Sequence, residues 1–215
     1  MSAPPIRLLL VEDDKVDRLA CRRALMADRS HAFEVIEAET GQEGLDLAAS
    51  CRPDCILLDY HLPDVTGLEF LTRFGAGAGA GAGSTPVPVM MLTGADSAAV
   101  AAESMRRGAR DYLVKDTEGR YLELLAGAVR RMLREQKLLS EKLQIEAKFR
   151  TLVEQIQAII YIAAPESENT LLYVSPQIAL LGFSPAEWLS KRELHARQLH
   201  PDDRRGALAA MAPAA

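Results

Sequence analysis

The sequence predicts an α/β protein: a doubly wound sheet of five parallel strands, followed by a long helix and a partial α+β segment. Over the first part of the chain, short apolar runs alternate with segments whose apolar residues recur at helical spacing. Strands that alternate with helices form a parallel sheet covered on both faces. Right-handed crossovers then restrict the topology to a doubly wound one.

The five strands appear as short apolar runs, as expected for strands buried in a parallel sheet. They are predicted at residues 6–11, 33–38, 55–58, 87–92 and 112–114. Thr40 and Glu43 fit a capping box that opens the helix after the second strand. Asp96 is suited to cap the helix after the fourth strand, and Gly108 to end it.

Residues 75–83 alternate strictly between glycine and alanine. Because such a tract cannot bury side chains, we expect a flexible loop between the third helix and the fourth strand. Silk-like stacking of strands is the alternative. The tract leads into the amino end of a strand, whereas ligands of such sheets bind at the carboxyl ends. The tract should therefore lie away from the residues that carry out the chemistry.

Residues 116–157 are almost free of helix breakers, and apolar side chains recur there at heptad-like spacing. The apolar stripe shifts midway, as a stutter would produce. We expect a parallel coiled coil that forms a homodimer through residues 120–150. The alternative is a lone amphipathic helix that lies on its own domain. The first stripe comprises Leu122, Leu125, Val129, Met132, Leu139 and Leu143, and the second Leu138, Ile145, Phe149, Leu152 and Ile156.

After the long helix, the sequence pattern changes to short strands and a short helix. Residues 159–163 and 171–174 have the pattern of strands. Ser184 and Glu187 form a capping box with Pro185 at the first helical position, and one more helix is expected after Pro201.

The composition excludes some classes of protein. With 30 acidic and 25 basic residues the net charge is −5, which argues against a broad nucleic-acid surface. No segment has the length of a membrane span or the layout of a signal peptide, so a cytoplasmic location is expected. Cys21, Cys51 and Cys55 are expected to be reduced thiols rather than a disulfide or a metal site.

Polar residues end four of the five predicted strands. The carboxyl ends of parallel strands share one edge, so these residues should meet at the crevice where the strand order reverses. Clustered carboxylates repel one another unless a cation joins them, and hard oxygen ligands select Mg²⁺. A lysine and a hydroxyl beside them suit transfer of a phosphoryl group onto a carboxylate. The residues are Glu12, Asp13 and Asp14 after the first strand, Asp59 after the third, Thr93 and Gly94 after the fourth, and Lys115 after the fifth.

Four segments, in this order, resemble the motifs of response-regulator receiver domains over about residues 5–130. They are Leu-Leu-Val-Glu-Asp-Asp (9–14), Leu-Leu-Asp-Tyr-His-Leu-Pro-Asp-Val-Thr-Gly-Leu (57–68), Met-Leu-Thr-Gly (91–94) and Asp-Tyr-Leu-Val-Lys (111–115). The resemblance implies a flavodoxin-like receiver at residues 1–120. It also implies Mg²⁺ as cofactor and a sensor histidine kinase or phosphotransfer protein as partner.

The resemblance also assigns a role to each residue of the site. Asp59 would be the phospho-acceptor, and Tyr112 the aromatic side chain that switches on activation. The metal would be held by Glu12 through water, by Asp13 and Asp59 directly and by the backbone carbonyl of His61, and the phosphoryl group by Thr93 and Lys115.

One departure from the family pattern concerns the residue after Lys115. The family usually has a cis proline there, whereas this chain has Asp116. A cis bond before a non-proline residue costs about 3–4 kcal/mol, so we expect a trans bond and a slightly altered loop. In the purely structural alternative, Asp13, Asp14 and Asp59 are caps and turn residues, Thr93 ends a strand, Lys115 is a surface charge and Tyr112 is core.

Residues from about 148 to 210 resemble the start of PAS domains. The similar segments are 149–155, 172–177, 181–188 and 199–203. A complete domain of this kind would continue into further strands, so the resemblance implies only its N-terminal part, at 148–215, behind a signalling helix at 117–150. No cofactor is expected there, and His195 and His200 are expected to be structural.

Together these features predict a phosphorelay response regulator that signals through its helix to the PAS-like segment. No catalytic output domain is expected, so its chemistry would be limited to its own phosphorylation and dephosphorylation, without nucleic-acid or membrane partners. An alternative is an Mg²⁺-dependent phosphatase with Asp59 as nucleophile, although such enzymes usually have a second carboxylate where His61 stands. Another is a PAS-type dimerisation scaffold with an inactive receiver.

Overall fold

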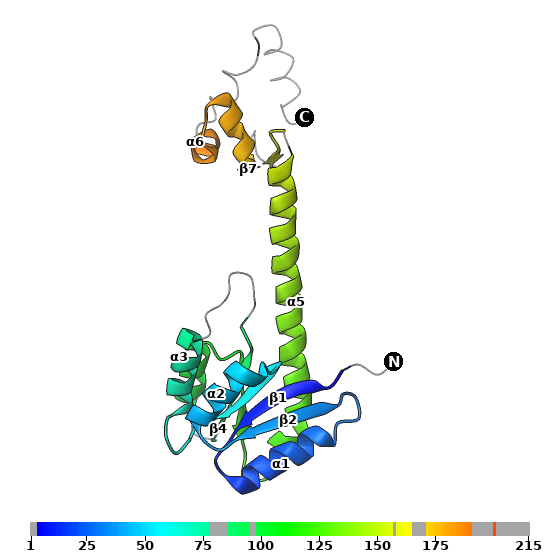
Figure 1. Ribbon diagram of the computed structural model, residues 1–215, viewed down its shortest axis with the longest axis vertical. Helices are drawn as coiled ribbons and strands as arrows, with labels where there is room; N and C mark the ends of the chain where they lie inside the picture. Colours follow the sequence, from blue (N-terminus) through cyan, green and yellow to red (C-terminus); the bar gives the residue numbers. More distant parts are fainter. Residues whose placement is uncertain are drawn as a thin grey trace. The chain divides into compact units, whose positions relative to one another are not determined.

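The computed structural model describes residues 4–77, 86–94, 98–156, 158–164, 171–190 and 200 of the chain. The chain divides into two compact units, Met1–Glu141 and Lys142–Ala215. Each unit is built around its own sheet (Figure 1).

The first unit contains a sheet of five parallel strands, as predicted. The strands follow the order β2-β1-β3-β4-β5, so the order reverses between β1 and β3. All neighbouring strands pair in parallel. Their bounds are β1 Ile6–Val11, β2 Phe33–Ala38, β3 Cys55–Asp59, β4 Val89–Gly94 and β5 Asp111–Lys115.

Helices cover both faces of this sheet (Figure 1). On one face, α1 (Lys15–Met26) and the first part of α5 (Tyr121–Gln155) pack against one core cluster. On the other face, α2 (Gly41–Cys51) and α3 (Gly67–Gly77) pack against a second cluster, and α4 (Ala98–Arg106) contacts α3. Alternate β1 residues serve the two clusters, since Leu8 faces one and Leu9 the other. The fold is therefore the flavodoxin-like receiver fold.

Several local predictions are confirmed. The Thr40 hydroxyl accepts a hydrogen bond from the Glu43 amide at 3.1 Å and so caps α2. Gly108, two residues after the end of α4, adopts φ +99°, a conformation that favours glycine. The cysteines are free, and Cys21 and Cys55 lie in the core.

In the first unit, β4 and α3 differ from their predicted extents by two residues or more, and in the second unit the strand predicted from residue 159 begins at Tyr161. β4 begins two residues later than expected and continues through Thr93 and Gly94, because it pairs with β5 as far as Lys115. α3 extends to Gly77, so residues 75–77 of the glycine–alanine tract are helical rather than a loop. The rest of the tract, and the expected cap Asp96, lie outside the described residues.

The expectation that α5 forms a dimer seam from residue 120 onward is wrong for its first part. Leu125, Val129 and Met132 have exposed fractions of 0, 0 and 1% because they belong to the core of the first unit. Leu122 also packs against that core, and Gln136 donates to the carbonyl of Pro86 at 3.1 Å. This part of α5 is thus an amphipathic helix that covers its own sheet.

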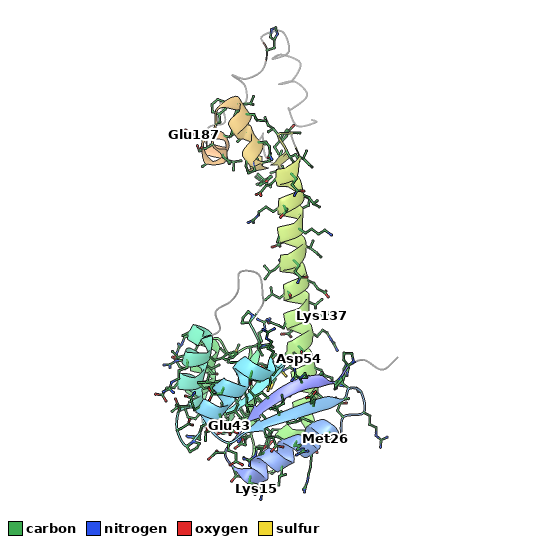
Figure 2. The ribbon with its side chains drawn as sticks, viewed as in Figure 1. Lys15, Met26, Glu43, Asp54, Lys137 and Glu187 are labelled. Atoms are coloured by element: carbon green, nitrogen blue, oxygen red, sulfur yellow. The ribbon has the colours of Figure 1, made fainter. Side chains whose placement is uncertain are left out.

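The second unit contains a two-stranded antiparallel sheet of β6 (Tyr161–Ala163) and β7 (Leu171–Val174). A 3-10 helix (η1, Pro176–Leu181) and α6 (Pro185–Ser190) follow. The predicted capping box is present: the Glu187 carboxylate accepts from the Ser184 amide at 3.0 Å, and the Ser184 hydroxyl accepts from the Glu187 amide at 3.3 Å. Figure 2 labels Glu187 at this helix start.

The core of the second unit is small, and it comprises Val174, Ile178 and Trp188 with Ile159, Leu171 and Phe183 packed around them. His195 and the helix expected after Pro201 lie outside the described residues. None of the helices in the described parts of the chain has the length and apolar character needed to cross a membrane.

The packing at Gly41 gives a first testable prediction. A Cβ at this position would lie 2.2 Å from Cγ2 of Val65, which belongs to the loop after β3. Gly41→Ala should therefore destabilise the fold by about 1–3 kcal/mol through overpacking. In contrast, a Cβ at Gly127 in α5 would meet nothing within 4 Å. Gly127→Ala should stabilise by about 0.5–1 kcal/mol through helix propensity.

Urea unfolding of the two variants and the parent protein measures both effects. Equal changes in the free energy of unfolding for the two variants would contradict the tight contact at Gly41.

Candidate functional site

The carboxyl ends of β1, β3 and β5 bring four predicted site residues together. Glu12 and Asp13 directly follow β1, Asp59 ends β3 and Lys115 ends β5. One oxygen each from Glu12, Asp13 and Asp59 lies within 4.8 Å of the other two. The predicted meeting of these residues at the sheet edge is confirmed.

Lys115 is the centre of the site. Its Nζ lies 2.5 Å from Oδ1 of Asp59, 2.6 Å from Oε2 of Glu12 and 3.0 Å from Oδ2 of Asp17. Burial alone would lower the pKa of Lys115, but hydrogen bonds and charges from Asp59 and Glu12 outweigh it and raise the pKa. The ammonium therefore stays protonated and offsets the charge of the carboxylates around it.

Asp59 is held at the floor of the site, with an exposed fraction of 6%. Its Oδ2 accepts a hydrogen bond of 2.7 Å from the backbone N–H of His61. Gly67 allows the following loop to fold back, since a Cβ there would lie 2.8 Å from the Asp59 carbonyl oxygen. The carboxylate is thus fixed by a cation on one oxygen and a backbone donor on the other.

Glu12 is almost completely buried, with 1% exposed. Burial raises its pKa to about 7, the Lys115 hydrogen bond opposes this, and the nearby Asp59 charge adds to it. A buried carboxyl with a high pKa is poised to gain a proton unless more positive charge arrives. With Asp13 and Asp59 it forms an all-oxygen cluster of the type that Mg²⁺ prefers.

The Thr93 hydroxyl supplies independent support for a ligand at this edge. Thr93 is 1% exposed, and its Oγ1 has no hydrogen-bond partner among the described residues. Buried hydroxyls are normally paired. Since Thr93 lies in β4, between β3 with Asp59 and β5 with Lys115, an anionic ligand at the site could accept this hydrogen bond.

Other predicted residues lie as follows. The side chain of His61 is exposed, and its ring lies edge-on to that of Tyr60, with 4.6 Å between centroids. Tyr112 is 44% exposed, so the alternative of a plain core residue is wrong. The Lys115–Asp116 peptide bond is trans, as expected.

Sequence reasoning missed two residues of α1, one that contacts Lys115 and one that holds the backbone behind the site. Asp17 contributes a further carboxylate to Lys115. Arg18 donates to the backbone carbonyl of Glu12 at 2.8 Å. The signal was their position three and four residues after Asp14, within the first turns of the helix that Asp14 caps through the amides of Val16 and Asp17.

Comparisons with known proteins agree with this geometry. Residues 8–126 match the family model "Response regulator receiver domain". The chain is 35% identical over 130 residues to the response regulator MprA of Mycolicibacterium vanbaalenii, covering 60% of this chain and 51% of that protein. It is also 35% identical over 132 residues to MprA of Mycobacterium tuberculosis, covering 61% and 52%. The chain therefore spans about half the length of these curated relatives.

Solved structures of response regulators match a similar share of the chain. The chemotaxis response regulator CheY4 of Vibrio cholerae is 26% identical, with a TM-score of 0.50, over 60% of this chain and 99% of that one. A CheY-like receiver domain protein from Methanospirillum hungatei is 26% identical, with a TM-score of 0.52, over 62% of this chain and 98% of that one.

The raised pKa of Glu12 predicts how metal binding depends on pH. Mg²⁺ favours the ionised carboxylate, so affinity should rise as pH rises through about 7. When the pH is lowered from 8 to 6, the affinity for Mg²⁺ should fall about tenfold, because Glu12 becomes mostly protonated. Isothermal titration calorimetry at several pH values measures this dependence. Glu12→Gln should flatten it, and an unchanged slope in that variant would show that another group titrates.

Proposed function

Because the chain belongs to the response regulator receiver domain family, we propose that it accepts a phosphoryl group on Asp59 from a histidine kinase or phosphotransfer protein of a two-component system. The observation that carries this assignment is the contact of Asp59 with Lys115 beside the Glu12–Asp13 pair, next to the unpaired Thr93 hydroxyl. A carboxylate nucleophile, a fixed cation, a set of carboxylates that can hold a metal ion and a hydroxyl donor are the parts that phosphoryl transfer to an aspartate needs.

In the proposed reaction an oxygen of Asp59 attacks the phosphorus of a phosphohistidine. A P–O bond forms to the carboxylate while the P–N bond breaks, and its electron pair stays on the imidazole nitrogen. Lys115 and the Thr93 hydroxyl bind oxygens of the transferred group. Loss of the group is hydrolysis: water attacks the phosphorus and Asp59 is released as a carboxylate. Among the residues that the structure describes, we place the proposed chemistry on Asp59.

The residues present fit Mg²⁺. Asp13 and Asp59 would bind it directly, Glu12 through water, and the His61 carbonyl would complete the set. Bound there, Mg²⁺ offsets the negative charge that builds up on the phosphoryl oxygens. Asp13 is exposed, whereas Glu12 and Asp59 are buried, so Asp13 is the ligand that a metal entering from solvent would meet first.

We further propose that α5 carries the output to the second unit, which we interpret as the start of a PAS-like domain. The support is the continuous helix from Tyr121 to Gln155, together with the strand pair, the 3-10 helix and the capped α6 that follow it. A cytoplasmic setting would suit the free thiols and the kinase partner.

A parallel homodimer is part of this proposal, but its seam begins later than the sequence alone suggested. The seam consists of residues separated by alternating steps of four and three, the spacing of d and a positions in a coiled coil. Its apolar members are 48–69% exposed. The helical positions are Leu138, Lys142, Ile145, Phe149 and Leu152, and Ile156 continues the spacing directly after the last residue of α5.

The partner along this seam is α5 of a second copy of the chain, because the charged residues in and beside the seam favour pairing of the helix with itself. Lys142 is the one polar residue in the series, at an a position, where a lysine specifies register at some cost in stability. Glu141 precedes it at a g position and would lie beside Lys142 of a second helix in a parallel pair. The seam covers fewer than the three to four heptads of a robust coiled coil, so a weak, concentration-dependent dimer is expected.

The assignment of Asp59 predicts that Asp59→Asn abolishes phosphorylation and leaves the fold intact, since the amide is nearly isosteric but a poor nucleophile. The measurement is mass spectrometry of the intact protein after incubation with acetyl phosphate and Mg²⁺, with circular dichroism as a check on folding. Asp46→Asn is a matched control at an exposed carboxylate of α2. A phosphorylated species that persists in Asp59→Asn would refute the assignment.

The proposed seam predicts that Phe149→Glu converts the dimer to a monomer. Leu124→Glu, a change at an exposed α5 residue outside the series, should not. Sedimentation equilibrium over a range of concentrations measures the difference. Lys142→Cys should cross-link to itself under mild oxidation, since only a parallel, in-register pair brings the two positions together. A wild-type monomer at the highest concentration, or equal behaviour of the two glutamate variants, would contradict the seam.

A further inference from the structure

Arg18 is a buried cation that stands behind the site rather than in it. It lies in the first turns of α1 and has an exposed fraction of 6%. Burying a guanidinium is costly unless its N–H groups are paired. Its contacts therefore show which parts of the structure it holds.

One side of the guanidinium binds the backbone of the acidic loop. Nη1 donates to the carbonyl oxygen of Glu12 at 2.8 Å and to that of Asp13 at 3.1 Å. These are the two loop residues of the acidic cluster. Arg18 thus fixes the backbone from which two of the three clustered carboxylates project.

The other side of the guanidinium is anchored to β2 and the residue after it. Nε donates to Oε2 of Glu37 at 3.3 Å, and Nη2 to Oε1 of Glu39 at 2.5 Å. The loop is also tied to β2 directly, since the Glu12 amide donates to the Ala38 carbonyl at 3.0 Å. Arg18 bridges the acidic loop to the neighbouring strand.

We propose that Arg18 is a positioning residue for the divalent cation: it holds the Glu12–Asp13 backbone so that both carboxylates stay beside Asp59. The inference rests on the proposed Mg²⁺ site. Carboxylates in a cluster repel one another. Because Asp13 is exposed, a shift of the loop backbone would carry its carboxylate away from Asp59 and toward solvent. Residues that orient metal ligands without touching the metal commonly change metal affinity by 10- to 100-fold.

Arginine suits this role and lysine does not. The planar guanidinium offers a rigid fork of donors, so it can bind two carbonyls on one edge and two carboxylates on the others. A lysine ammonium would keep the charge but could not span these four acceptors. Arg18→Lys therefore separates the geometry of the fork from its charge.

The test measures Mg²⁺ affinity by isothermal titration calorimetry in the full chain. Arg18→Lys should bind Mg²⁺ about tenfold more weakly than the parent protein. In the metal-free protein, the amides of Asp13 and Asp14 should exchange hydrogen faster. Arg22→Lys is the matched control: Arg22 also pairs with Glu37, at 3.1 Å, but is half exposed. It should leave both readouts unchanged.

A double variant, Glu37→Ala with Glu39→Ala, probes the same bridge from the anchor side, in case Arg18→Lys folds poorly. It should weaken Mg²⁺ binding in the same direction by a smaller factor. Parent-like affinity and exchange in a folded Arg18→Lys protein would overturn the inference, as would an equal loss in Arg22→Lys. If the parent protein itself fails to bind Mg²⁺, the proposed function fails, whereas the exchange rates in metal-free protein still decide whether Arg18 holds the loop.

Discussion

Three carboxylates converge on the ammonium of Lys115, and the rest of the receiver unit is arranged around this contact. Glu12 directly follows β1, Asp59 ends β3 and Asp17 lies in α1, so a single cation joins three parts of the chain at the sheet edge. Without it, their mutual repulsion and the burial of Glu12 and Asp59 would oppose folding. Burial is the main reason that the pKa of Glu12 is raised, and the nearby Asp59 charge adds to it. The negative charge that remains makes the site receptive to a metal ion.

Other acidic side chains near this edge of the sheet fix the starts of two helices. The Asp14 side chain caps α1 directly after the acidic loop, which directs the helix so that Asp17 reaches Lys115. On the other side of the crevice, the Asp64 carboxylate accepts from the amides of Gly41 and Gln42 at 2.8 Å each, and so joins the loop after β3 to the start of α2. Acidic side chains thus serve two distinct purposes at this edge, because some cap helix starts and others stay available to ligands.

The strands and the residues at their ends could be predicted from the sequence. A buried parallel strand is a short apolar run, and the carboxyl ends of all parallel strands lie at the same edge of the sheet. Asp17 and Arg18 could not, since their contacts depend on where α1 lies over the sheet edge, which periodicity does not specify. The extent of β4 also escaped prediction, because pairing with β5 determines it. The apolar stripe of α5 was ambiguous for a related reason: spacing identifies a buried face but not whether its own sheet or a second chain covers it.

The structure resolves that ambiguity for the first part of α5, and the result bears on how a signal could leave the site. Leu125, Val129 and Met132 are part of the receiver core, and Leu113 of β5 packs against the same cluster. Lys115 lies two residues beyond Leu113 on that strand. A phosphoryl group that redirects Lys115 would therefore act on a strand packed beneath the base of α5. In the proposed relay, the part of α5 that belongs to the receiver core would move with the sheet edge, without local unfolding.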